Sequence, residues 1–229
     1  MKKSELKYSS IYLRTTTIFN VFLGVRLKIY KGPTILYTYS VFLKFLSKTK
    51  KNFLYNSCIG HNVNIINSSI NVYSIGIRDN ICLLSYEKSL DSLQIACLVC
   101  KELGRINSTI LFINTFTDYN DIIKVAAGTM YQPALLNNFA SGSLTNKLIH
   151  ILPTIIFVSS TKKYSLVLKE SRRLNIPIFS INDTNISPDL LSFPVIASDD
   201  CLETQHYVLK VISYSFVLGL LLLYLDTAQ

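Results

Sequence analysis

From residue 81 onward the chain alternates between short apolar runs and segments with helical spacing of apolar residues. Five runs of six to eight residues predict β-strands, because they are largely apolar throughout and bounded by turn-forming residues: 81–86, 108–115, 153–160, 176–182 and 193–198. Strands that are apolar at nearly every position are buried on both faces. The pattern therefore indicates a parallel sheet covered by helices.

The segments between these runs repeat apolar residues every three or four positions. They predict helices over 88–104, 118–130 and 162–175, and a last helix that begins near Ser198. Thr117 or Asp118 is available to cap the second helix, and Ser198 or Asp199 to cap the last. Alternating strands and helices are joined by right-handed crossovers. The predicted fold class is α/β: a three-layer parallel sheet of flavodoxin-like or Rossmann-like order, flanked by helices.

The positive charge of the chain is concentrated at its start. Residues 1–51 hold eleven Lys and Arg against the single acid Glu5, whereas residues 52–229 hold twelve basic and thirteen acidic residues. Tyrosines and phenylalanines lie between these basic residues. Such a segment favours a nucleic acid, because paired phosphates release counterions and aromatic rings stack on bases; a solvated or membrane-surface segment is the alternative. We predict a basic, aromatic-rich extension over 1–55 and an α/β domain over 56–229.

The carboxyl ends of the predicted strands form one rim, where ligands of open α/β proteins bind. Asp183, Asp199 and Asp200 lie there and suit Mg²⁺ or a phosphate ester, so an enzyme is one alternative. The sequence, however, has no glycine-rich phosphate motif and no nucleophile elbow, and its three histidines lack metal-ligand spacing. We expect no cofactor and no metal, and structural roles in turns and caps for six residues: Asp183, Thr184, Asn185, Pro188, Asp199 and Asp200.

The cysteines and one apolar segment bear on compartment and membrane attachment. Five sparsely spaced cysteines favour reduced thiols. Cys97 and Cys100 form a C-x-x-C late in a predicted helix, which favours buried helix residues over a redox pair. The fifteen residues Val211–Leu225 are apolar, which is long enough for a core helix and short of the roughly 20 residues of a membrane span. A membrane-attached protein is a further alternative.

From about Cys58 to Leu218 the chain resembles the small-subunit ribosomal protein two family of bacteria and organelles. Six blocks carry the resemblance in family order: "IGH" (59–61), "IGIRDNICLLSYEKSLDSLQIA" (75–96), "STILFINT" (108–115), "FASGSLTN" (139–146), "LPTIIFVSS" (152–160) and "ESRRLNIPIFSINDTNISPDLLSFPVIASDD" (170–200). The last block is the most specific, with a strand, Asp-Thr-Asn, a Pro-Asp turn, a second strand and Asp-Asp.

The resemblance implies a structural component of the small ribosomal subunit that binds ribosomal RNA and neighbouring ribosomal proteins, with no catalytic role and no small-molecule substrate. Combined with the basic segment, it gives fourteen residues expected to contact RNA: Arg14, Arg26, Lys28, Lys31, Lys44, Lys48, Lys50, Lys51, His61, Arg78, Asn80, Thr145, Asn146 and Lys147. For His61 and Asn146 a structural hydrogen bond is an equal alternative.

Two departures from the family pattern suggest an organelle. Bacterial members carry a long helical hairpin where this chain has only residues 147–151, and the first 55 residues have no clear family match. The abundance of Ile, Asn, Lys, Tyr and Phe with only eight glycines is typical of an A/T-rich genome. We expect a mitochondrial ribosome rather than a plastid one, and no stable membrane span.

Overall fold

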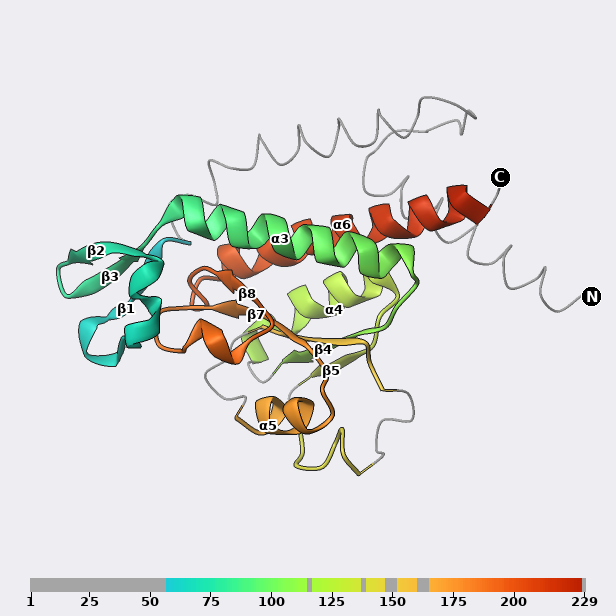
Figure 1. The fold of residues 1–229 in the computed structure, drawn as a ribbon, viewed down its shortest axis with the longest axis horizontal. Coiled ribbons are helices and arrows are strands. Elements are labelled where there is room, and N and C mark those ends of the chain that lie inside the picture. The colour runs from blue at the N-terminus through green and yellow to red at the C-terminus, as the bar shows by residue number, and fades with distance from the viewer. Residues whose placement is uncertain (1–56, 115–116, 137–138, 147–151, 160–164, 228–229) are drawn as a thin grey trace, which may run out of the picture. The chain divides into compact units, whose positions relative to one another are not determined.

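The computed structural model describes residues 57–114, 117–136, 139–146, 152–159 and 165–227 (Figure 1). The chain divides between Lys48 and Thr49, so all described residues belong to one unit. The predicted extension over 1–55 lies outside them, and its boundary stays a prediction.

The centre of this unit is a parallel sheet of five strands. They are β4 (Ile110–Asn114), β5 (Ala134–Leu136), β6 (Ile155–Val158), β7 (Ile178–Asn182) and β8 (Phe193–Ile196). Their spatial order is β5-β4-β6-β7-β8, and every neighbouring pair is parallel. Counted along the chain within this sheet, the order is 2-1-3-4-5, which is the flavodoxin-like order. The predicted fold class is confirmed.

Both faces of the sheet are apolar, as the strand composition predicted. On one face Phe112, Phe157 and Phe179 lie in register on adjacent strands, with ring centroids 5.1 and 5.3 Å apart. Alternate residues such as Leu111 and Ile156 point to the other face and pack against α5 (Ser165–Arg173). Burial on both faces explains why the strands read as continuous apolar runs.

Three helices cover the phenylalanine face, and α5 lies on the opposite side (Figure 1). They are α3 (Tyr86–Arg105), α4 (Asn120–Met130) and α6 (Leu202–Thr227). At Gly104 an added Cβ would lie 2.2 Å from the Phe216 carbonyl oxygen of α6. The backbones of α3 and α6 therefore meet where only glycine fits.

The cysteine pair lies in this helix layer. Cys97 and Cys100 are buried and free, so their prediction as buried helix residues is confirmed. Burial raises the pKa of the Cys97 thiol to about 11, and its hydrogen bond with Ser215 opposes that shift only in part. Thiols with such pKa values stay protonated and unreactive at neutral pH.

One predicted strand belongs to a different sheet. Residues 81–86 were expected in the parallel sheet, but β3 (Ile81–Leu84) pairs antiparallel with β1 (Ile59–Asn62) and β2 (Ser74–Arg78), in the order β1-β3-β2. The cause is the turn at Asp79 and Asn80, whose φ values of 50° and 61° form a two-residue hairpin. The fifth parallel strand is instead β5, which at three residues is too short to predict from periodicity.

The small sheet is attached at the carboxyl end of β7. Its connections include the short 3-10 helices η1 (Val63–Ile65) and η2 (Ser68–Val72). Ile70 of η2 and Leu84 of β3 pack against Ile196 of β8 in a buried cluster. Nearby, the Asn67 amide donates to the Thr184 carbonyl at 2.9 Å. These contacts bring β1 beside the rim of the parallel sheet.

Two helices start differently from the prediction. The 3-10 helix η3 (Thr117–Tyr119) precedes α4, whose N-cap is Tyr119 with no side-chain cap bond, so capping by Thr117 or Asp118 is wrong. Helix α6 begins at Leu202, which leaves Ser198 and Asp199 ahead of its first turn. Both residues are buried directly after β8 instead of standing at the helix end.

Helix α6 has the length and the apolar composition of a membrane span, and it is the one helix in the described ranges that does. In this fold it packs along α3 and against α4. The 18-residue window of α6 that meets this test is 44% buried in the structure.

Candidate functional site

The centre of the rim is filled by amide and hydroxyl side chains. Asn114, which ends β4, donates to the Asn120 side chain at 2.8 Å and accepts from the Ser159 hydroxyl at 2.7 Å. The buried Gln205 of α6 donates to the Ser159 carbonyl at 2.8 Å and to the Asp199 carbonyl at 3.1 Å. These bonds join the starts of α4 and α6 to the strand ends. The titratable side chains of the rim lie at its other end, beside β1.

There the small sheet brings His61 onto the rim. Gly60 permits the approach, since an added Cβ would lie 2.4 Å from the Thr184 methyl group. The His61 amide donates to the Thr184 hydroxyl at 2.8 Å. Its ring nitrogen Nδ1 lies 3.0 Å from Asp183 Oδ2, and Nε2 lies 3.1 Å from Asp200 Oδ2. The imidazole is therefore held between two carboxylates.

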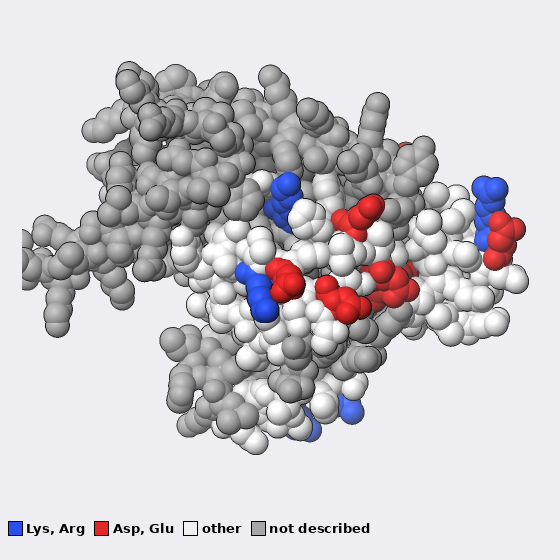
Figure 2. All heavy atoms as spheres, turned by 180° about the vertical axis from the view of Figure 1, so that it is seen from behind, with Lys and Arg blue, Asp and Glu red and all other residues white. Residues whose placement is uncertain are grey.

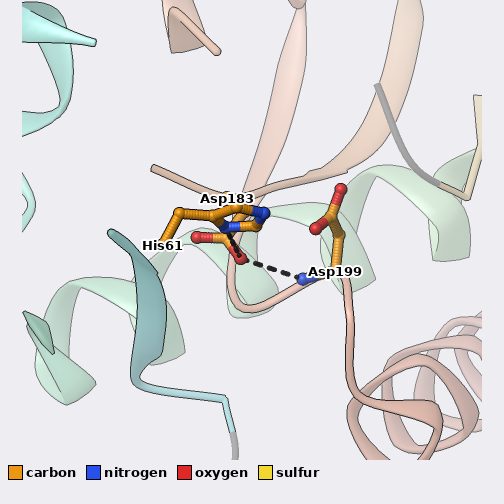
Figure 3. Close-up of side chains that lie close together, drawn as sticks. All are labelled: His61, Asp183 and Asp199. Atoms are coloured by element: carbon orange, nitrogen blue, oxygen red, sulfur yellow. Dashed lines mark hydrogen bonds and ion pairs between the residues drawn. The ribbon is translucent and has the colours of Figure 1, made fainter. Parts of the chain in front are cut away.

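Figure 3 shows how His61, Asp183 and Asp199 lie together. One ligand atom from each of the three falls within 4.8 Å of the others. We call these residues and Asp200 the His61 cluster. Asp183 and Asp199 are fully buried, while the Asp200 side chain is 67% exposed. An imidazole with several carboxylates is a donor set that binds divalent transition ions, although we expected no metal from the sequence.

The acidic stretch after β7 also shapes the chain locally. Asp183 accepts from the Thr184 amide at 2.5 Å and from the Asp199 amide at 3.3 Å. Asn185 lies in the turn that follows, and Pro188 opens η4 (Pro188–Leu190). The Tyr119 hydroxyl donates to the Asp199 and Asp200 carbonyls at 3.2 and 3.0 Å. The residues that shape these turns are thus the same ones that bring the His61 cluster together.

The residues expected to contact RNA do not converge on one place. Arg78 and Asn80 lie at the β2–β3 hairpin turn, where the Arg78 side chain is 82% exposed. Thr145 and Asn146 are exposed at the end of a loop whose Gly142 and Leu144 amides donate to Glu170 of α5. His61 is held inside its cluster. The remaining nine lie outside the described residues: Arg14, Arg26, Lys28, Lys31, Lys44, Lys48, Lys50, Lys51 and Lys147.

The loop of Thr145 and Asn146 is held by a residue that sequence reasoning missed. Glu170 of α5 is buried and accepts from the Gly142 amide at 2.5 Å and the Leu144 amide at 3.0 Å. Gly142 has a φ of +86°, and an added Cβ would lie 2.4 Å from the Asn146 side chain. In the sequence, two features could have pointed to this contact: an acidic residue in an otherwise basic helix, and a Gly-x-Leu sequence at 142–144.

The charge of the described surface is not that of a strong polyanion binder. The described residues include nine Lys and Arg and thirteen Asp and Glu. Figure 2 shows acidic side chains gathered near the middle of one face, with few basic ones beside them. Residues 52–229 as a whole hold twelve basic and thirteen acidic residues, so the excess of basic residues lies in the first 51.

Comparison with known proteins identifies the family. The family described as ribosomal protein S2 matches residues 55–150 and 147–219. The two matched segments overlap at residues 147–150.

Similar proteins include small ribosomal subunit protein uS2 from several bacteria. That of Caulobacter vibrioides is 23% identical over 208 residues, which cover 70% of this chain and 78% of the relative. That of Borrelia hermsii is 21% identical over 202 residues, which cover 67% and 80%. A shorter region of 69 residues, 30% of this chain and 25% of the relative, is 39% identical to that of Mycobacteroides abscessus. With a family match across most of its length, this chain belongs to the ribosomal protein S2 family.

Proposed function

We propose that this chain is a structural constituent of the mitochondrial small ribosomal subunit, where it binds small-subunit ribosomal RNA and neighbouring ribosomal proteins and performs no catalysis. Membership of the ribosomal protein S2 family supports the coarser part, a structural role in the small ribosomal subunit. The mitochondrial assignment rests on the A/T-rich residue usage and on the short segment at 147–151.

The observation that carries the RNA proposal is the division of charge. Eleven of the 23 Lys and Arg lie in the first 51 residues, with one acid among them. Residues 52–229 hold twelve basic and thirteen acidic residues, which nearly balance. A basic segment gains affinity by releasing counterions from RNA phosphates. The segment is therefore the RNA anchor, while Arg78, Asn80, Thr145 and Asn146 make local contacts that set orientation.

RNA binding measured over a range of salt concentrations tests this proposal. Replacing eight basic residues by Gln keeps the aromatic residues and removes the charge: Arg14, Arg26, Lys28, Lys31, Lys44, Lys48, Lys50 and Lys51. We expect weaker binding to small-subunit RNA and a flatter plot of log affinity against log salt. The slope should fall by about 0.7 to 0.9 for each phosphate that a basic side chain no longer neutralises.

A single substitution at the β2–β3 hairpin turn tests whether Arg78 contacts one RNA phosphate, separately from the effect of the basic N-terminal segment. Arg78→Ala is expected to weaken binding and to reduce the salt slope by about 0.7 to 0.9, the value for one phosphate. Lys124→Ala is its matched control, because Lys124 is an exposed base of α4 that already lies 3.5 Å from Asp121. If the plot of log affinity against log salt has the same slope for the wild type and for the variant with eight Gln substitutions, the N-terminal segment does not anchor the RNA.

A further inference from the structure

Half of the basic residues after residue 51 are concentrated in one stretch of the sequence. Residues 147–173 hold six of the twelve Lys and Arg found in 52–229, with only one of the thirteen acids. The structure describes three of these six, Lys169, Arg172 and Arg173, and all three are exposed on α5. We call them the α5 basic face. The nearly balanced charge of 52–229 thus includes one local excess of positive charge.

The α5 basic face is not neutralised by acids of its own surroundings. Its residues are three and four positions apart, so they are neighbours on the helix surface. The one acid of α5, Glu170, is buried and is occupied by backbone amides. No ion pair joins the α5 basic face to an acid in the part of the chain that the structure describes. By contrast, three exposed bases elsewhere each pair with an aspartate: Arg78, Arg105 and Lys124.

A polar loop is fixed to the same helix. Glu170, which follows Lys169, accepts from the Gly142 and Leu144 amides at 2.5 and 3.0 Å. The Leu144 side chain lies in the buried cluster that contains Val167 of α5. Thr145 and Asn146 come directly after Leu144 and are exposed. The loop therefore brings hydroxyl and amide side chains to the helix that carries the three bases.

The composition of this surface suits a phosphate backbone. A guanidinium group binds two phosphate oxygens through parallel N–H bonds, and hydroxyl and amide side chains add contacts to phosphate and sugar. Protein interfaces instead centre on apolar or aromatic anchors, whereas Leu166 is the one large apolar residue exposed on α5. Interaction with the helix dipole would account for Arg172 and Arg173 in the last turn, but not for Lys169 one turn earlier.

We propose that the α5 basic face, together with Thr145 and Asn146, forms a second contact with the phosphate backbone of small-subunit ribosomal RNA. This inference rests on the function proposed above and adds a contact that is separate from the basic N-terminal segment. The three bases neutralise up to about three phosphates. Glu170 is a positioning residue, because it holds the loop to α5 without facing the RNA itself. The contact lies on the opposite side of the parallel sheet from α3, α4 and α6 (Figure 1).

RNA binding by the full chain over a range of salt concentrations tests the proposal. The test variant carries three substitutions: Lys169→Gln, Arg172→Gln and Arg173→Gln. We expect it to keep the wild-type Tm, because the three residues are exposed and Gln is a good helix former. The slope of log affinity against log salt should fall by about 2 to 3, which is about 0.7 to 0.9 for each phosphate. Replacing both arginines by Lys keeps the charge and is expected to keep the slope.

The matched control removes the same charge from separate places on the surface. It carries Gln at three exposed bases of α3 and α4: Lys88, Arg105 and Lys124. Because these residues do not form one face, we expect the control to bind RNA with nearly the wild-type slope. A bare loss of three positive charges would instead flatten both plots equally, and that result would overturn the proposal.

Chemical modification of arginine shows the contact directly. Phenylglyoxal reacts with accessible guanidinium groups, and mass spectrometry measures the extent of reaction at each one. When purified small-subunit RNA is bound to the full chain, we expect Arg172 and Arg173 to be protected. Arg105, which pairs with Asp226, is expected to react to the same extent with and without RNA.

The results distinguish this contact from the function on which it rests. If the wild type binds the RNA and the variant with eight N-terminal Gln substitutions loses affinity, the proposed function stands. The α5 contact is then overturned if the α5 variant has the slope of its control, or if Arg172 and Arg173 stay reactive in the RNA complex, as they would if the face met an acidic protein. If the wild type does not bind small-subunit RNA, both proposals are wrong.

Discussion

Some single side chains in this protein connect segments that lie far apart in the sequence. Glu170 is the clearest case, because one buried carboxylate accepts two backbone amides of the loop at 142–144. A buried amide that loses its acceptor costs about 1 to 3 kcal/mol. Glu170 therefore holds the exposed Thr145 and Asn146 in place, although it is itself remote from solvent.

Glu170→Ala is expected to lower the free energy of unfolding by about 1 to 3 kcal/mol, because both amides lose their acceptor. Urea unfolding of the full chain measures the change. Glu170→Gln keeps one side-chain acceptor and is expected to lose less. Lys169→Ala, the exposed neighbour on α5, is expected to change stability by no more than about 0.5 kcal/mol. Equal midpoints for Glu170→Ala and Lys169→Ala would show that the loop does not depend on Glu170.

At the scale of elements, the sequence predicted long periodic segments well and short ones poorly. Four of the five predicted strands form the parallel sheet, since their apolar runs reflect burial on both faces. The three residues of β5 and the strands β1 and β2 were missed, because short, partly exposed strands carry little periodicity. The close crossing of α3 and α6 could not be predicted from the sequence either, because it depends on the position of Gly104 against the backbone of α6.

Two glycine substitutions in helices are expected to have opposite effects on Tm. Gly104→Ala should lower it, because the new methyl group would lie 2.2 Å from the Phe216 carbonyl oxygen and force α3 and α6 apart, at a cost of about 1 to 3 kcal/mol. Gly128→Ala in α4 meets open space and should raise it, by up to about 1 kcal/mol of helix propensity. If Gly104→Ala leaves Tm unchanged or raises it as Gly128→Ala does, the crossing is looser than the structure shows.

At the scale of the whole molecule, the charge is divided between a basic start and a slightly acidic α/β body. In the function that we propose, the α/β domain has a structural role and the basic N-terminal segment provides affinity for RNA phosphates. The apolar α6 packs along α3 and against α4 within this body.

Fractionation of mitochondria that contain the chain tests this assignment. We expect the chain to sediment with the small ribosomal subunit and to be released from membranes by alkaline extraction, since α6 packs along α3 and against α4. A matrix enzyme and an integral membrane protein serve as markers for the two fractions. Retention in the extracted membrane pellet would favour the membrane-attached alternative instead.

The sequence by itself determined the α/β class, the burial of the strands on both faces and the place of the basic charge. Each of these follows from the composition of the chain and from the spacing of its apolar and charged residues, which are local properties of the sequence. Only the tertiary structure decided that His61 meets Asp183 and Asp199, which lie more than a hundred residues later in the chain, and that Glu170 holds the loop at 142–144. Such pairs depend on strand order and on how the small sheet docks, and periodicity carries no information about either.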